Sequence, residues 1–198
     1  MTIKSTLVSG PIGGEPGEPG KVSSRHVHTG RVIALDVDTV RFPDGSVREM
    51  DMIHHSGAAA VVPFLSDPAG EDPQLLLLRQ YRYAAGGYLW EIPAGRLDAG
   101  EAPLACAHRE LREETGCTAA EMVPLTAFLT TPGFTDEKIH IFMASGLTTG
   151  DAAREADEFI EVVAKPLSEV LLMIERGEII DAKTLVGILF AAGFRLGR

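Results

Sequence analysis

The chain has 198 residues, of which 45% are hydrophobic and 23% charged, a balance typical of a folded domain with a core rather than of a disordered segment. Its 28 acidic residues outnumber its 18 basic ones and give a net charge of −10, which disfavours a nucleic acid as the partner. No apolar run approaches the roughly 20 residues of a membrane span, and MTIKSTLVSG lacks the apolar stretch of a signal peptide, so we expect a cytoplasmic protein without a membrane partner.

The first part of the chain has the pattern of a tail followed by a small β unit. Residues 1–24 contain GPIGGEPGEPG, which offers little to bury, and we expect a flexible tail. Strand-like runs follow at 31–42 and 46–55, and PDG at 43–45 has the composition of a hairpin turn. We therefore expect residues 25–55 to form a small antiparallel β unit.

The remaining residues, 56–198, have the pattern of a larger domain. Strand candidates are 58–65, 74–83 and 89–93, with three more starting at Met122, Glu137 and Glu158. One helix is expected between Pro166 and Gly177, and another after Asp181, whose run TLVGILFAAGF is apolar nearly all round and is expected to be buried. Strands mixed with helices favour an α/β or α+β sandwich.

A further helix is predicted within GRLDAGEAPLACAHRELREETG, residues 95–116. Pro103 suits its first turn, and Gly116 suits the residue after its last turn. Its expected buried stripe consists of Leu104, Ala107 and Leu111.

The two cysteines, Cys106 and Cys117, lie within and just after this helix. At ~1.5 Å per residue, the helix would hold their Cα atoms farther apart than the about 7 Å that a disulfide allows. Their spacing also matches no common zinc-ligand pattern. We expect free thiols, which fit a reducing compartment.

Three acidic side chains, Glu110, Glu113 and Glu114, share one flank of the same helix, since residues three and four apart are neighbours on its surface. Like charges at this spacing repel, so a compensating positive charge is expected. A divalent cation is one compensator, because Mg²⁺ and Mn²⁺ both accept carboxylate oxygens. Arg109 and Arg112, which lie between the acids in the sequence, are the other.

The full spacing of glycines, acids and arginine resembles the Nudix box. The matching residues are Gly95, Glu101, Arg109, Glu110, Leu111, Glu113, Glu114 and Gly116, and Cys117 stands where the family has an aliphatic residue. The resemblance implies the Nudix fold, an α/β/α sandwich with a mixed sheet, beside the small N-terminal β unit. It also implies hydrolysis of a nucleoside diphosphate linked to another moiety, with Mg²⁺ as the cofactor and Mn²⁺ as a substitute. An acidic site and an anionic diphosphate repel each other until such ions bridge them.

The same resemblance implies roles for residues in and beside the box. The expected main metal ligands are the side chains of Glu110 and Glu114, with the carbonyl oxygen of Ala94 as an additional ligand. Glu113 is expected to be a further ligand or an orienting group in catalysis. Arg109 is expected to support catalysis by holding the loop and the helix together through an ion pair with Glu101.

The general base is expected on the loop TPGFTDE, residues 131–137. Family likeness favours Glu137, which ends the loop and would bring a further carboxylate to the attacking water. A base must lie within hydrogen-bond reach of that water, and Asp136 and Glu113 stay open as alternatives.

Segments outside the box are similar to those of ADP-ribose pyrophosphatases. They are RQYRYAAGGYLWEIPAG before the box and TPGFTDE after it, with Pro132 sixteen residues beyond Gly116. Dimeric members of that branch exchange a small β domain across the two-fold axis, so residues 25–55 are expected to build a homodimer and to contact the substrate. The expected reaction splits ADP-ribose or a related ADP-sugar into AMP and a sugar phosphate. The alternatives are NADH, a dinucleoside polyphosphate or another nucleotide sugar as substrate, or a sensor that binds ADP-ribose without cleaving it.

Two arginines and four aromatic residues are candidates for binding the nucleotide. Arg82 suits a phosphate, because a guanidinium offers a planar fork of donors, and Arg48 is expected to reach in from the hairpin of the other subunit. A surface ion pair is the alternative for both arginines. Phe134 is a candidate platform for adenine, together with Phe42, Tyr81 and Tyr83. The histidines are expected to be structural rather than metal ligands: His26, His28, His54 and His55.

Overall fold

The chain folds as two units, each with its own sheets. Backbone contacts group Met1–His55 with Thr131–Asp136 in the first unit, and Ser56–Thr130 with Glu137–Arg198 in the second. The structure is a computed structural model and describes residues 17–150 and 159–197.

The first unit contains an antiparallel sheet with the strand order β1, β2, β3. Its strands are β1 (Gly20–Thr29), β2 (Ala34–Arg41) and β3 (Val47–His54). In the turn between β2 and β3, Gly45 adopts a left-handed φ of 81°, and the Asp44 carboxylate accepts a hydrogen bond from the Ser46 N–H at 2.9 Å. The two predicted strands and the predicted turn are confirmed.

Strand β1 begins inside the segment that we expected to be a tail. It pairs with β2 from Gly20, opposite Arg41, to Thr29, opposite Ala34. The structure thus differs from the expectation for residues 20–24, because backbone hydrogen bonds hold a strand whose side chains are almost all exposed. Composition indicates how much of a segment can be buried. It gives no sign of a strand such as β1, whose side chains are almost all exposed. Residues 1–16 of the expected tail lie outside the described residues.

The second unit contains two sheets in the part of the chain that the structure describes. One has the order β10, β5, β6 and the other the order β7, β4, β9, β8, in which β4 and β9 run parallel and the remaining pairs antiparallel. The strands are β4 (Ala58–Pro63), β5 (Gln74–Arg82), β6 (Gly87–Glu91), β7 (Ala94–Arg96), β8 (Cys117–Leu129), β9 (Lys138–Thr149) and β10 (Ile160–Pro166). The helical elements are η1 (Tyr83–Ala85), α1 (Pro103–Thr115), α2 (Leu167–Glu175), α3 (Ala182–Phe190) and η2 (Ala191–Leu196).

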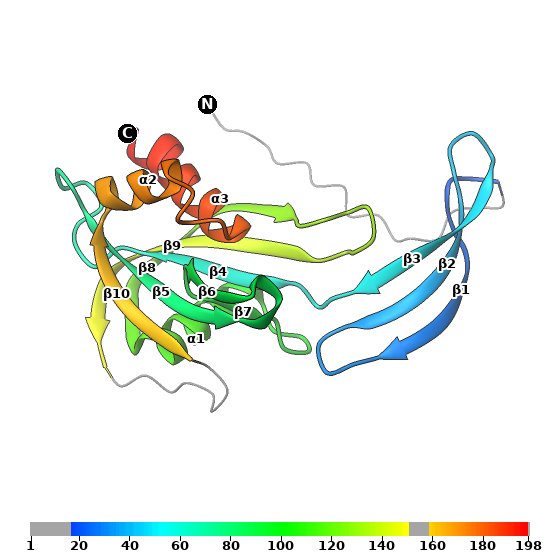
Figure 1. Ribbon diagram of the computed structural model, residues 1–198, viewed down its shortest axis with the longest axis horizontal. Coiled ribbons are helices and arrows are strands. Elements are labelled where there is room, and N and C mark those ends of the chain that lie inside the picture. The colour runs from blue at the N-terminus through cyan, green and yellow to red at the C-terminus, as the bar shows by residue number, and fades with distance from the viewer. Residues whose placement is uncertain (1–16, 151–158, 198) are drawn as a thin grey trace. The chain divides into compact units, whose positions relative to one another are not determined.

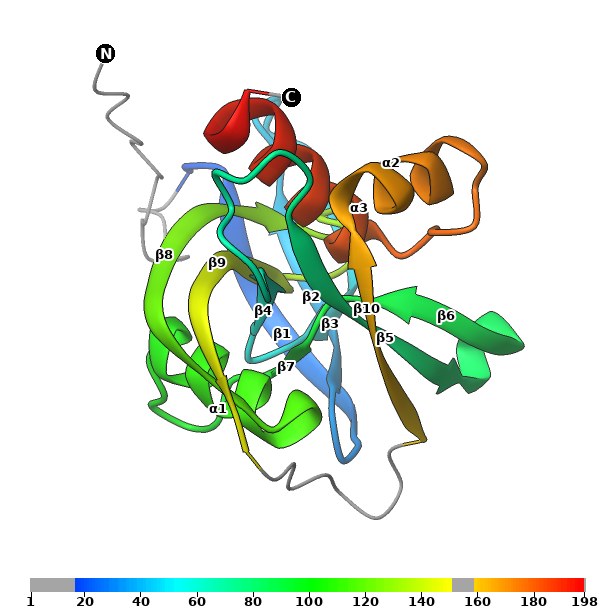
Figure 2. The ribbon, with the colours of Figure 1, turned by 90° about the vertical axis from the view of Figure 1, so that its left-hand side faces the viewer.

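Helices cover the sheets of this unit on both sides. Successive strand residues point to opposite faces, and strand β4 shows the consequence. Ala60 and Val62 pack in the cluster that includes α2 and α3, while Ala59 and Val61 pack in the cluster that includes α1. Figures 1 and 2 show α1 on one side of the sheets and α2 and α3 on the other. The predicted α/β/α sandwich with a mixed sheet is confirmed.

The ends of the helices follow the sequence signals. Gly116 ends α1 with a φ of 74°, and its N–H donates to the carbonyl oxygen of Arg112 at 2.8 Å. Asp181 caps α3 by accepting from the Thr184 N–H at 3.0 Å. The apolar run TLVGILFAAGF, which we expected to be buried, is buried on one face only, since Leu189 and Phe194 are exposed.

No described helix is long and apolar enough to cross a membrane.

The buried face of α1 differs from the expected stripe. Ala107 and Leu111 are buried, but Leu104 is 45% exposed. Glu110 and Glu114, expected on an outer flank, are only 7% and 2% exposed. The helix is therefore rotated so that two of its acids face the interior, which an apolar stripe alone could not indicate.

Candidate active site

The site is built where strand β7 meets helix α1. β7 pairs antiparallel with β4, with Ala94 opposite Ala60 and Gly95 opposite Ala59. The sequence predicts no strand here, because a three-residue strand depends on a partner distant in the sequence. This pairing fixes the backbone against which the helix packs.

The carboxylates of Glu110 and Glu114 both reach this strand. The Ala94 N–H donates to Oε2 of Glu114 at 2.9 Å. The Glu110 carboxylate lies so close to Gly95 that a Cβ atom at this position would overlap it. Gly95 is therefore required for its lack of a side chain, and the two acids, four residues apart, converge on adjacent backbone residues.

Arg109 joins the loop to the helix. It donates to both oxygens of Glu101, from Nε at 2.9 Å and from Nη2 at 2.8 Å, and to the carbonyl oxygen of Arg96 at 3.0 Å. Its Nη1 donates to Glu110 at 2.5 Å and to Glu113 at 3.1 Å. The predicted ion pair between Arg109 and Glu101 is confirmed. Hydrogen bonds from Arg109 lower the pKa of Glu101 to about 2, and Glu101 in turn raises the pKa of Arg109.

We expect Glu101→Gln to reduce the free energy of unfolding at neutral pH and to have little effect near pH 2. The pKa of Glu101 is lowered from 4.5 to about 2 in the folded chain, so the unfolded chain binds more protons between these values. The stabilisation is present above the unfolded pKa and is lost as the pH falls through the folded one. Urea unfolding of both proteins across this range measures it. A difference that does not change with pH would contradict the role of the charge.

The charges around Arg109 leave room for a cation. One guanidinium contacts three carboxylates, and Arg112 lies 3.9 Å from Glu113, beyond hydrogen-bond distance. The site is compatible with both expected sources of positive charge, the arginines and a divalent cation. Arg109 brings a single positive charge to the three carboxylates that it contacts. Hard carboxylate and carbonyl oxygens are the donors that Mg²⁺ accepts, and the residues present fit this ion. Its holders would be Glu110, Glu113, Glu114 and the carbonyl oxygen of Ala94.

Both cysteines are buried thiols. Cys106 and Cys117 are both free and buried, as expected. Burial raises the pKa of the Cys106 thiol to about 12, and the charge of Glu110 adds to this effect. Burial and the raised pKa both disfavour the thiolate, which is the form that acts as a nucleophile or a metal ligand.

Arg82, the candidate phosphate-binding residue, is held by a buried acid. Its Nε and Nη2 donate to the two oxygens of Glu91 at 2.7 and 2.8 Å, and Lys183 pairs with the same carboxylate. Burial would raise the pKa of Glu91, but the hydrogen bonds and charges of Arg82 and Lys183 outweigh it and lower the pKa. Glu91 and Glu114 both raise the pKa of Arg82, the first mainly by hydrogen bonding. Sequence reasoning missed Lys183, since a lone lysine at a helix start carries no distinctive pattern.

Two other candidate binding residues belong to the first unit. The Arg48 guanidinium lies over the ring of Phe42, 5.9 Å from its centroid. Phe134 is 48% exposed, on the segment Thr131–Asp136. Their roles toward a nucleotide stay predictions.

The rival general bases have different surroundings. Glu137 accepts from the Thr130 hydroxyl at 3.0 Å. Both oxygens of Asp136 are engaged, one by the His55 N–H at 2.8 Å and the other by Nδ1 of His54 at 2.6 Å. The identity of the general base therefore stays a prediction, with Glu137 favoured by family likeness and Asp136 and Glu113 as the alternatives.

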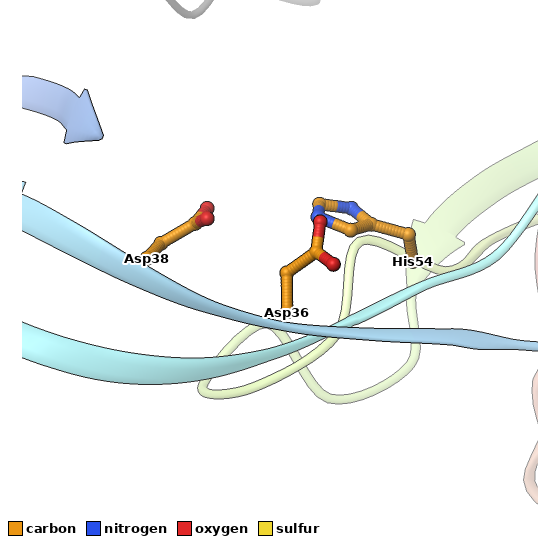
Figure 3. A group of neighbouring side chains, drawn as sticks. All are labelled: Asp36, Asp38 and His54. Carbon is orange, nitrogen blue, oxygen red and sulfur yellow. The ribbon is translucent and has the colours of Figure 1, made fainter. Parts of the chain in front are cut away.

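A second group with the composition of a metal site lies in the first unit. Asp36, Asp38 and His54 each offer a ligand atom within 4.8 Å of the others. Figure 3 shows the three side chains. These carboxylates already have partners, because His26 is 2.7 Å from Asp36 and Lys21 is 3.6 Å from Asp38. We interpret the group as an ion-pair network, and the structural role expected for the histidines stays a prediction.

Comparisons with known proteins agree with this geometry. The family model of the NUDIX domain matches residues 55–185. An ADP-ribose pyrophosphatase of Bacillus subtilis (strain 168) is 37% identical over 86% of this chain and 91% of its own length. A methanol dehydrogenase activator of Bacillus methanolicus is 35% identical over the same shares. The crystal structure of an ADP compounds hydrolase has a TM-score of 0.76 and 21% identity, covering 89% of this chain and 94% of that chain.

The match to the family model spans the strand, loop and helix that carry the acids, and the relatives cover nearly the whole chain. The Nudix-box spacing and the convergence of Glu110 and Glu114 on β7 fall within it, together with most of the α/β/α sandwich. The chain belongs to the NUDIX domain family.

Proposed function

We propose that the protein is a Mg²⁺-dependent hydrolase, with Mn²⁺ as a substitute, that splits ADP-ribose or a related ADP-sugar into AMP and a sugar phosphate. The observation that carries this is the convergence of buried Glu110 and Glu114 on Ala94 and Gly95, with one arginine against several acids. A relative named ADP-ribose pyrophosphatase at 37% identity supports the choice of substrate.

The residues of the chain have distinct tasks in this reaction. Glu110, Glu113, Glu114 and the Ala94 carbonyl hold the cation, and Arg109 fixes the helix against the loop by its bonds to Glu101 and Arg96. When bound, Mg²⁺ supplies positive charge against the diphosphate oxygens and the leaving phosphate. Water adds across the P–O–P link: its oxygen joins one phosphorus, the bridging oxygen leaves with the other, and Glu137 takes the proton.

Arg82, Arg48 and Phe134 complete the proposed substrate contacts. Glu91 holds the Arg82 guanidinium in a fixed orientation, which reduces the entropy lost when it binds a phosphate.

Arg48 and Phe134 belong to the unit that we propose forms a homodimer. Sedimentation of the full chain should then give twice the 21.2 kDa of one chain, and a mass of one chain would refute the dimer.

We place the enzyme in the cytoplasm, which agrees with its two free cysteines.

A panel of nucleotides tests the activity. The protein is incubated with Mg²⁺ and ADP-ribose, ADP-glucose, GDP-mannose, NADH or diadenosine polyphosphate, and the phosphate products are identified. We expect ADP-ribose to give the highest kcat/KM, with AMP as a product, and a chelator to abolish turnover until Mg²⁺ is restored. Faster cleavage of NADH or of the dinucleotide would overturn the substrate, and tight binding of ADP-ribose without cleavage would indicate a sensor.

A further inference from the structure

The segment Thr131–Asp136 lies between strands β8 and β9 of the second unit but packs in the first. The N–H of Ile53 on β3 donates to the carbonyl oxygen of Phe134 at 2.7 Å, and the Asp136 N–H donates to the carbonyl oxygen of Ile53 at 3.3 Å. Ile53 and Thr135 thus form a parallel bridge, which extends the pairing of β3 by one short step.

The Asp136 side chain strengthens this attachment. One oxygen accepts from the His55 N–H at 2.8 Å and the other lies 2.6 Å from Nδ1 of His54. A carboxylate only accepts, so Nδ1 carries the proton. The other ring nitrogen of His54 is 3.5 Å from Asp36 on β2. Figure 3 shows the side chains of this pair next to each other. His54 is therefore held from two sides.

The end of the segment leads directly to the proposed general base. Glu137 follows Asp136, its carbonyl oxygen accepts from the Thr130 N–H at 3.1 Å, and its side chain accepts from the Thr130 hydroxyl. Thr130 and Glu137 thus close the base of the loop, while Asp136 attaches its last residue to β3. A base that is displaced by about 1 Å loses much of its effect, so restraint of the residue before it matters for catalysis.

We propose that Asp136 and His54 form a clamp that fixes the segment leading into Glu137, which makes both of them positioning residues for the reaction. This inference rests on the proposed function, in which Glu137 takes the proton of the attacking water. Neither residue needs to contact the substrate.

Three variants test the clamp. His54→Leu removes the donor to Asp136, His54→Asn keeps an N–H near the position of Nδ1, and Asp136→Asn removes the charged acceptor. We expect His54→Leu and Asp136→Asn to lower kcat about tenfold or more with little change in KM, and His54→Asn to retain most of the activity. The double variant that combines His54→Leu with Asp136→Asn should be no worse than either single one, because both substitutions remove the same contact.

Because Asp136 was also a rival for the general base, the His54 variants carry the decision. An additive double variant, or normal kcat in His54→Leu, would overturn the clamp. Asp51→Asn is the matched control, since Asp51 is an exposed acid on the same strand β3. It should behave as the unmodified protein.

Hydrogen exchange gives a readout that does not depend on activity. The amides of Ile53 and Asp136 should exchange faster in His54→Leu and Asp136→Asn, but not in Asp51→Asn. Unchanged exchange would overturn the clamp, and faster exchange with normal kcat would overturn its role toward Glu137. If the unmodified protein cleaves no nucleotide, the proposed function fails, while hydrogen exchange still decides whether the clamp exists.

Discussion

Glu114→Gln should lower kcat for ADP-ribose by about a thousandfold, which corresponds to the several kcal/mol that a correctly placed metal ion contributes to a transition state. The substitution removes a charged ligand but keeps an oxygen that can accept from the Ala94 N–H, so the fold should survive. Circular dichroism and thermal unfolding check the fold, and calorimetric titration with Mn²⁺ checks the loss of metal affinity.

Glu175→Gln is the control for this experiment, because Glu175 is an exposed acid at the end of α2. It should leave both kcat and metal binding unchanged. If Glu114→Gln turned over substrate at nearly the normal rate, the assignment of Glu114 as a metal ligand would be wrong.

Gly95→Ala should nearly abolish activity, by about a hundredfold or more, while hardly changing stability. The new Cβ would meet the end of the Glu110 side chain, which can swing away at little cost to the fold. Replacing glycine by alanine also reduces the freedom of the unfolded chain, which offsets part of any strain by about 0.4–1 kcal/mol. What is lost is the position of the carboxylate, and steady-state kinetics beside urea unfolding separates the two effects.

Gly193→Ala is the matched control, since no heavy atom lies within 4 Å of the Cβ it would add. A second comparison uses Glu110→Ala, which removes the very side chain that the Gly95→Ala substitution would displace. Adding Gly95→Ala to that variant should have little further effect on kcat. Full additivity of the two losses would show that Gly95 acts through something other than Glu110.

The box could be predicted from the sequence because its spacing is local. Pro103, Gly116 and the acids lie on one helix, and the ion pair between Arg109 and Glu101 spans only eight residues. The burial of Glu110 and Glu114 could not be predicted in this way, because a helical wheel assigns acidic residues to the solvent side. Gly95, which has no side chain, leaves space for the Glu110 carboxylate beside β7.

Features that depend on distant partners also escaped prediction. Strand β7 exists through its pairing with β4. The contact between His54 and Asp136 joins residues that are 82 positions apart. The sequence gives no sign of these contacts. Hydrophobic periodicity indicates which side chains are buried, but not which distant residue a backbone or side-chain group bonds to.

The first unit draws on two separated stretches of polypeptide, Met1–His55 and Thr131–Asp136. It therefore cannot be removed or transferred as one continuous segment. A truncation that begins after β3 would leave the second stretch without the strand it pairs with. A graft of the sheet onto another protein would lack the second stretch. The two stretches would have to be moved together for the sheet to keep the bridge between Ile53 and Thr135.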